Sequence, residues 1–427
     1  MKIRKTFLVA LCRAIIASAF WLAIRVSNSL TISGVKYDKG LPRTYLGMTH
    51  KRDIDPFILI PTIIFHRGWK ALASDVHFAL RGDGFTPGFL ARIMGGRPAW
   101  IARLLRPLAV GPALRWLGTY PTEGLLRPAE EWIREALLVH GDGEAGTTLS
   151  PAFLRDFAQA VHLSPEQVQA MPLSDFLAWR YHAAIQPFYG PEMLLKTKRR
   201  QIEQRVVARI HTQLEEIVAC LWRDGSFFGS PEGQLSPDGR ISPLNAGFHR
   251  IVRAAPPDLR VLPVALTYDF MTTGRPHIFV DFAPALEYAP KLPRAELDQL
   301  LRHSWLRHMH FTCTQLASGF LMERKRASSL EFTFDDLTRA IYQQACELAK
   351  AGRHVDPQLL RPSGVRKKAR GYLAYVERRG LIRRCASDRW QITFGELVIQ
   401  VRPREVAYDD VPLLYAYNEL QELLSIS

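Results

Sequence analysis

A histidine and an aspartate lie close together in the segment Thr49-His50-Lys51-Arg52-Asp53-Ile54-Asp55-Pro56. This H-x-x-x-x-D spacing follows an apolar run, residues 44–48, that we expect to be a short buried strand. An imidazole at a strand end, positioned by a carboxylate one turn later, can act as a general base toward a hydroxyl group. The same spacing is also typical of a surface loop in which Asp55-Pro56 only starts a helix, with Asp55 as its N-cap.

A second candidate site lies in residues 225–240, which read GSFFGSPEGQLSPDGR. An apolar strand running into Pro231-Glu232-Gly233 places a carboxylate and a turn rich in N–H groups at a strand end. Open α/β sheets bind ligands at such ends. Taken alone, the segment is equally typical of a plain turn.

Together these segments resemble the glycerolipid acyltransferase family, the lysophosphatidic acid acyltransferases or PlsC-like proteins. The resemblance covers about residues 25–285, apart from a helical insertion. It is carried by the His50/Asp55 pair after a strand, the lead-in LTISGVKY at 30–37, Gly118-Thr119-Tyr120-Pro121, the strand before Pro231-Glu232-Gly233 with Asp238-Gly239-Arg240, and Val261-Leu262-Pro263-Val264.

The resemblance implies a reaction and a role for each matching residue. His50 would remove the proton from an acceptor alcohol, Asp55 would hold and stabilise the imidazole, and the alkoxide would attack an acyl thioester on CoA or acyl carrier protein. The resemblance implies no metal and no covalent enzyme intermediate. It also implies no cofactor, because the acyl thioester is a substrate. The acceptor would bind beside the remaining matching residues, which are Gly118, Pro121, Pro231, Glu232, Gly233 and Arg240.

Two arginines of the family's pattern are absent. Pro121 is followed by Thr122, and Gly233 is followed by Gln234, where the family places arginines that hold a glycerol phosphate. A dianion without paired cations is poorly held in a partly buried site. Either Arg240, Arg250 or the basic cluster at 196–200 replaces them, or the acceptor is a less charged lipid, glycolipid or terpenoid alcohol.

The elements that must position these residues alternate between short apolar strands and helices, which indicates an α/β fold with a mixed sheet flanked by helices. We expect strands over 30–33, 44–48, 71–78, 226–228, 260–267 and 277–282, a Gly-rich loop over 82–96 and a helix over 98–117. We expect an N-terminal helix (1–29), an acyltransferase domain (30–298) and a mostly helical C-terminal domain (299–427) ending in two strands within 390–401. The helical insertion, about 125–222, carries amphipathic segments at 130–139, 151–161, 165–171, 175–185 and 196–222.

The first residues predict contact with a membrane. Lys2, Arg4 and Lys5 precede an apolar run over 7–24 that only Arg13 interrupts. A central arginine costs about 2.5–3.5 kcal/mol on insertion scales, so a helix lying in the interface on the cytoplasmic face is favoured over a clean crossing. A cleaved signal peptide and a buried core helix are the alternatives.

Composition leaves two kinds of partner open. The 427 residues carry a formal net charge of +15, and such a basic surplus is typical of proteins that bind anionic lipid or nucleic acid. The five cysteines are scattered without a CxxC pair, which indicates a reducing compartment and argues against zinc ribbons. The apolar fraction of 47% excludes a disordered chain.

The C-terminal region supports a rival hypothesis from another class. Residues 364–393 read as a helix, a stop at Gly380 and a β-hairpin, the outline of a nucleic-acid-binding winged helix. Its basic residues are Arg366, Lys367, Lys368, Arg370, Arg378, Arg379, Arg383 and Arg384. The histidines at 303, 308 and 310 predict no metal site, because 308 and 310 do not share a helix face and no carboxylate stands at ligand spacing.

Overall fold

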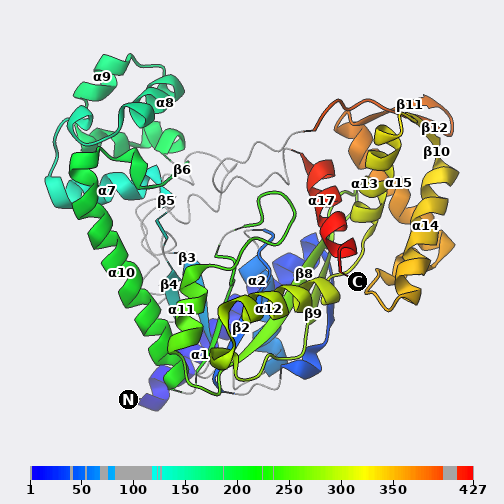
Figure 1. Cartoon of the computed structure of the whole chain (residues 1–427), viewed down its shortest axis with the longest axis horizontal. Helices are drawn as coiled ribbons and strands as arrows, with labels where there is room; N and C mark the ends of the chain where they lie inside the picture. The colour runs from blue at the N-terminus through cyan, green and yellow to red at the C-terminus, as the bar shows by residue number, and fades with distance from the viewer. Residues whose placement is uncertain are drawn as a thin grey trace. The chain divides into compact units, whose positions relative to one another are not determined.

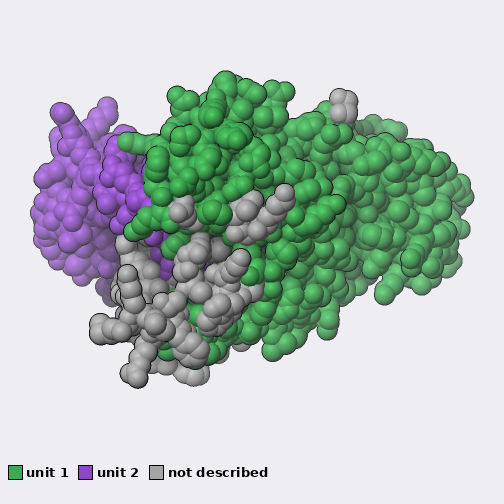
Figure 2. Space-filling view, turned by 90° about the horizontal axis from the view of Figure 1, so that it is seen from below, with its two compact units in different colours: residues 1–77, 220–427 green, residues 78–219 purple. Residues whose placement is uncertain are grey.

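The chain is described by a computed structural model that covers residues 2–38, 42–52, 55–67, 76–81, 118–122, 124–125, 127–185, 187–223, 225–233, 235–397 and 411–426. It forms two compact units (Figure 2), residues 1–77 with 220–427 and residues 78–219. Most of the expected insertion, 125–222, belongs to the second unit, and the N-terminal helix and residues 299–427 belong to the first. The loop expected over 82–96 and the helix expected over 98–117 lie outside the described residues.

Seven strands form a mixed sheet in the order β1-β9-β8-β2-β7-β3-β4, so the fold is α/β, as predicted (Figure 1). Their bounds are β1 Ser29–Ser33, β2 Thr44–Met48, β3 Val76–Arg81, β4 Thr119–Thr122, β7 Ser226–Gly229, β8 Arg260–Asp269 and β9 His277–Phe282. The strand expected over 71–78 is represented by β3, which begins at Val76, and residues 71–75 lie outside the described part of the chain.

The middle of the sheet is parallel and buried on both faces. Every residue of β2 is buried, which matches its continuous run TYLGM rather than an alternating pattern. β2 pairs in parallel with β7 on one side, with Gly47 opposite Gly229, and with β8 on the other, with Gly47 opposite Pro263. The carboxyl ends of β2 and β7 therefore lie side by side, while β8 continues to Asp269 and pairs antiparallel with β9.

The helices of the first unit that lie around the sheet are α1 Lys2–Ser27, α2 Asp55–Arg67, α11 Ala246–Ala254 and α12 Arg294–His308 (Figure 1). The C-terminal region of the same unit contains α13 Cys313–Arg326, α14 Phe334–Lys350, α15 Pro362–Arg378 and α17 Pro412–Leu424, and α13 contacts both β8 and α17. Helix α2 begins at Asp55 itself, so this residue lies inside the first turn rather than before it.

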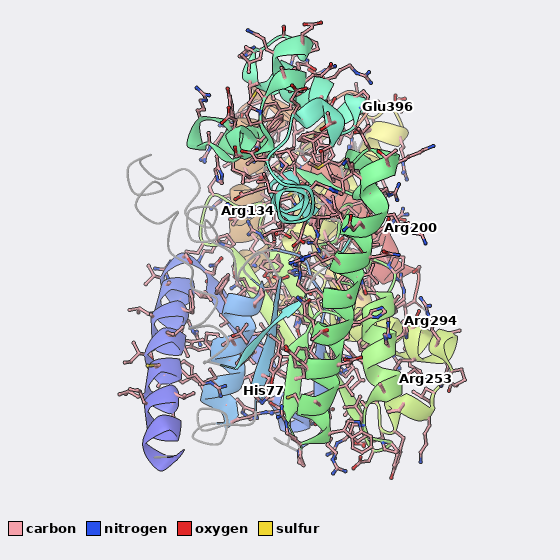
Figure 3. All side chains as sticks on the ribbon, turned by 90° about the vertical axis from the view of Figure 1, so that its left-hand side faces the viewer. His77, Arg134, Arg200, Arg253, Arg294 and Glu396 are labelled. Carbon is pink, nitrogen blue, oxygen red and sulfur yellow. The ribbon has the colours of Figure 1, made fainter. Side chains whose placement is uncertain are left out.

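Helix α1 packs on α2 through one face and leaves the opposite face open (Figure 3). Its buried residues Ala10, Arg13, Ala17 and Ile24 recur at helical spacing, and the Phe20 ring contacts the tilted ring of Phe57 with centroids 4.7 Å apart. The arginine that interrupts the apolar run is thus turned toward the protein and is only 6% exposed. The segment Leu8–Ser27 is long and apolar enough to cross a bilayer.

The C-terminal residues adopt the element order of a winged helix. α13 is followed by β10 (Glu331–Thr333), α14, α15 and the hairpin of β11 (Ile382–Ala386) and β12 (Arg389–Ile392), and the three strands pair antiparallel. Of the two strands expected within 390–401, β12 accounts for one; its hairpin partner β11 precedes it, residues 393–397 form no strand, and residues 398–401 lie outside the described residues.

A buried ion triad connects this region to the sheet. Lys368 Nζ on α15 contacts Asp269 Oδ2 at the end of β8 at 2.6 Å and also contacts Asp356. Burial acts to lower the pKa of Lys368, but the two carboxylates outweigh it and raise the pKa. Lys368 is therefore one cation of the basic region that is committed to an internal structural role.

The second unit is a helical assembly around aromatic side chains. Its elements are β5 Arg127–Pro128, α7 Ala129–His140, α8 Pro151–Val161, α9 Pro165–Ala170, β6 Phe188–Tyr189 and α10 Lys196–Trp222, whose last residues belong to the first unit. Trp132, Phe153, Phe157 and Phe176 form the centre of its core. The helix expected over 175–185 was wrong in type, since two 3-10 helices, Leu173–Leu177 and Trp179–Ile185, occupy this stretch.

Candidate active site

His50 follows the carboxyl end of β2, and the neighbouring strand fixes the backbone there. Thr49 N donates to Val264 O at 3.1 Å, and Leu266 N donates to Thr49 Oγ1 at 2.9 Å. On the other side, Ser236 N donates to His50 O at 2.9 Å. The backbone on either side of the imidazole is thus held by hydrogen bonds from β8 and from the loop after β7.

The His50 and Asp55 side chains are joined directly. His50 Nδ1 lies 3.0 Å from Asp55 Oδ2, and the same oxygen accepts from Lys51 N at 2.7 Å and Arg52 N at 2.8 Å. Tyr268, on the part of β8 that extends past β2, donates its hydroxyl to Asp55 Oδ1. Because the carboxylate of Asp55 accepts hydrogen bonds from all these groups, the Nδ1 proton of His50 points at Asp55. The free lone pair of the imidazole is then on Nε2.

Burial differs sharply between the two partners. The Asp55 side chain is 0% exposed, whereas the His50 ring is 19% exposed. Because the hydrogen bonds of Asp55 leave it a single orientation, it holds the imidazole in one tautomer and one position. The pair can therefore accept a proton at Nε2 and stabilise the resulting imidazolium.

Glu232 contacts the backbone of His50. Its Oε1 accepts from His50 N at 2.8 Å, its Oε2 accepts from Ser242 N at 2.7 Å, and the side chain is 2% exposed. Burial raises the pKa of Glu232 to about 7, although Lys51 and these two N–H groups act in the opposite direction. The carboxylate thus connects the strand end at 50 with the loop at 242.

The raised pKa of Glu232 predicts a pH dependence of stability. Between the ordinary value of 4.5 and about 7 the folded chain holds a proton here that the unfolded chain has lost. This contribution is therefore complete below 4.5 and is lost as the pH rises through about 7, amounting to about 3 kcal/mol at most. We expect urea unfolding at pH 5 to 8 to show this decline in the parent and in the exposed control Glu296→Gln, and to lack it in Glu232→Gln. An unchanged slope in Glu232→Gln would contradict the assignment.

A buried lysine ties the site to the end of the chain. Lys51 is 2% exposed, and its Nζ donates to Gly239 O at 2.8 Å and lies 3.4 Å from Glu419 Oε1 on α17. Gly239 adopts a φ of 96°, and a Cβ there would lie 2.2 Å from Tyr415 O, so only glycine fits between this loop and α17. The Asp238-Gly239-Arg240 segment is thereby attached beside His50.

The remaining predicted residues fall in two places. Pro231 is buried and accepts from Asn245 N at 2.7 Å through its carbonyl, Gly233 is exposed with a φ of 69°, and Arg240 is exposed. Gly118 and Pro121 belong to the second unit, where Phe78 N donates to Gly118 O and Pro121 pairs with Leu80. The structure brings His50, Asp55 and Glu232 together by direct hydrogen bonds, and it attaches the 236–240 loop to them.

Three residues of the site were missed by sequence reasoning: Lys51, Tyr268 and Glu419. Lys51 lies inside the His50–Asp55 segment, where no local pattern indicates that a lysine is buried. Tyr268 follows the expected strand 260–267 by one residue, so extending that strand would have indicated it. Glu419 is too distant in sequence from His50 for any local pattern to connect them.

The site thus belongs to an α/β protein with a histidine–aspartate pair at the carboxyl end of a central parallel strand. No family model matches the chain, and no curated protein matches it. Among solved structures, it is similar to the 1-acyl-sn-glycerophosphate (LPA) acyltransferase PlsC from Thermotoga maritima, with 10% sequence identity and a TM-score of 0.35 over 69% of this chain and 76% of that chain.

Proposed function

We propose that the protein is a membrane-associated O-acyltransferase that moves a fatty acyl group from an acyl thioester to the hydroxyl of a lipid or glycerol phosphate acceptor. The observation that carries the proposal is the imidazole of His50 held at 3.0 Å by the fully buried Asp55. The resemblance of several short segments, in the same order along the chain, to motifs of the glycerolipid acyltransferase family suggests the reaction class.

The pair is suited to one proton transfer in each direction. His50 Nε2 takes the proton of the acceptor hydroxyl as its oxygen attacks the thioester carbonyl. The carbon–sulfur bond then breaks, and the imidazolium returns the proton to the departing thiolate of CoA or acyl carrier protein. Asp55 remains ionised throughout and stabilises the intermediate positive charge.

Contact with a membrane is supported by the open face of α1. Large apolar side chains on this face are between 51 and 65% exposed: Leu8, Ile15, Leu22 and Val26. Phe65 of α2 is 48% exposed. Because Arg13 is turned inward, its charge does not oppose contact of this face with hydrocarbon. We infer that α1 lies against the bilayer and keeps the site near lipid substrates, on the cytoplasmic face.

An anionic acceptor head group needs a cation where the family's two arginines are missing. Arg240 is exposed and follows Gly239, whose carbonyl accepts a hydrogen bond from the Lys51 ammonium, so its backbone is attached to the residue next to His50. We propose that Arg240 replaces the family's missing phosphate-binding arginines. A single exposed arginine favours an acceptor with a monoanionic or uncharged head group over a bare phosphate.

Nucleic-acid binding is the second candidate, favoured by the winged-helix order of the C-terminal elements. Several of its cations are engaged within the chain: Lys368 is held by two carboxylates, Arg366 lies 2.9 Å from Asp335, and Arg383 donates to Gln391. Phosphate binding by these side chains would have to break those contacts first. Acyl transfer therefore remains the function that the site supports best.

A direct assay separates the two functions. The purified full chain in lipid nanodiscs is incubated with labelled acyl-CoA or acyl carrier protein and a total lipid extract, and labelled products are identified by mass spectrometry. We expect one labelled ester class and flotation of the chain with anionic liposomes. No labelled ester with either donor, together with salt-sensitive binding to duplex DNA and indifference to liposomes, would overturn the proposal.

A further inference from the structure

A second cluster of titratable side chains lies two strands away from β2 in the sheet, near the carboxyl ends of β1 and β9, where Asp281 pairs with Ser33 of β1 and Ala265 of β8. Asp281 on β9, His310 after α12 and His354 after α14 bring their ligand-type atoms within 4.8 Å of one another. Asp281 is 1% exposed and the His310 side chain 10%, whereas that of His354 is 38% exposed. These residues take no part in the proposed acyl transfer.

The distances fit a small cation. His310 Nδ1 lies 3.0 Å from Asp281 Oδ2, and His354 Nδ1 lies 3.7 Å from Asp281 Oδ1. Ligands at 2.0–2.1 Å around a tetrahedral zinc ion are separated by about 3.3 Å, between these two values. Although 3.0 Å apart, His310 Nδ1 and Asp281 Oδ2 are buried atoms without a hydrogen-bond partner in the described residues. The two atoms lie as close as an ion pair, and they are near enough to contact one common ion.

The three residues are held by other parts of the first unit. Ser33 of β1 lies opposite Asp281 in the sheet and donates its hydroxyl to Asp281 Oδ1. Phe311 N donates to His354 O at 2.8 Å, which places the segments carrying His310 and His354 side by side. The His310 ring also stacks on Phe279, with centroids 4.3 Å apart. Such outer contacts orient metal ligands before the ion arrives.

The chemistry of the donor atoms suits a metal as well. Imidazole nitrogen with carboxylate oxygen is a donor set that zinc and similar divalent transition metals accept.

We propose that Asp281, His310 and His354 bind one divalent transition-metal ion of the zinc class, with the fourth position open to solvent beside His354. The ion would connect the sheet at β9 to the segments after α12 and α14. It would thereby stabilise the first unit, because it binds the folded chain and not the unfolded one.

The test measures metal binding rather than activity. The full chain in detergent is stripped with a chelator, dialysed and titrated with ZnCl2, with metal content read by mass spectrometry, and with CoCl2, whose visible absorption reports a tetrahedral site. We expect about one zinc per chain and a rise in melting temperature of about 5 °C at 100-fold excess over the dissociation constant.

Variants separate this site from adventitious binding. His354→Ala removes a ligand that is partly exposed, so the variant should fold, and we expect its zinc affinity to fall about 100-fold or more. His310→Ala should act likewise, and His303→Ala, an exposed histidine on α12, should bind as the parent does. Less than about 0.1 zinc per chain in the parent, or equal affinity in His354→Ala and His303→Ala, would overturn the proposal.

Discussion

Replacing His50 with alanine is expected to lower the rate of acyl transfer by about 10² to 10⁴-fold or more, because the step then lacks its general base. The ring is partly exposed, and the hydrogen bonds that position residue 50 run through its backbone N and O, so the fold should survive. The measurement is initial-rate transfer of labelled acyl groups to the acceptor found in the lipid-extract assay, with circular dichroism to verify folding.

The exposed histidine at position 303 supplies the matched control. His303→Ala should transfer acyl groups at the parental rate, since its side chain lies on the outside of α12. Parental activity in His50→Ala would contradict the mechanism even if the chain proved to be an acyltransferase. Absence of activity in the parent would instead contradict the function itself, so the two failures can be told apart.

Replacing Asp55 with asparagine is expected to lower the transfer rate by about 10³-fold. The two backbone N–H groups and His50 Nδ1 all point at Oδ2, so an asparagine places its oxygen there and retains the tautomer of His50. What it removes is the negative charge beside the forming imidazolium, worth about 4 kcal/mol for charges 4 Å apart at an effective dielectric constant of 20.

The expected signature is a fall in kcat with little change in KM, because the charge acts on the transition state and not on substrate binding. Asp258→Asn serves as the control, since this aspartate is 54% exposed in its pair with Arg43. A parental kcat in Asp55→Asn would show that Asp55 only starts a helix, which is the plain interpretation of the sequence.

The helices and strands whose formation depends on residues close together in the sequence were predictable. Apolar runs and helical periodicity are local signals, and the elements predicted from them matched the structure within one residue. These are the strands 30–33, 44–48 and 277–282 and the helices 151–161 and 196–222. The segment 175–185 misled because its amphipathic pattern was read as α-helical, whereas the chain forms 3-10 turns there around Phe176.

The meeting of Glu232 with His50 is an intermediate case. Both follow apolar strands, and parallel strands place their carboxyl ends at one edge, so their proximity follows once β2 and β7 are neighbours. Their hydrogen bond does not follow from pattern. The sequence indicated a carboxylate facing the acceptor, while the structure has it buried and bonded to backbone N–H groups.

By itself, the sequence determined that Asp55, at the start of a helix, can reach His50, since only five peptide units separate the two residues. Tertiary structure alone decided that Tyr268 and Glu419 join that site and that Asp281, His310 and His354 converge elsewhere. The physical reason is that contacts between distant segments depend on strand order and helix packing, which burial of the whole core selects and no local pattern encodes.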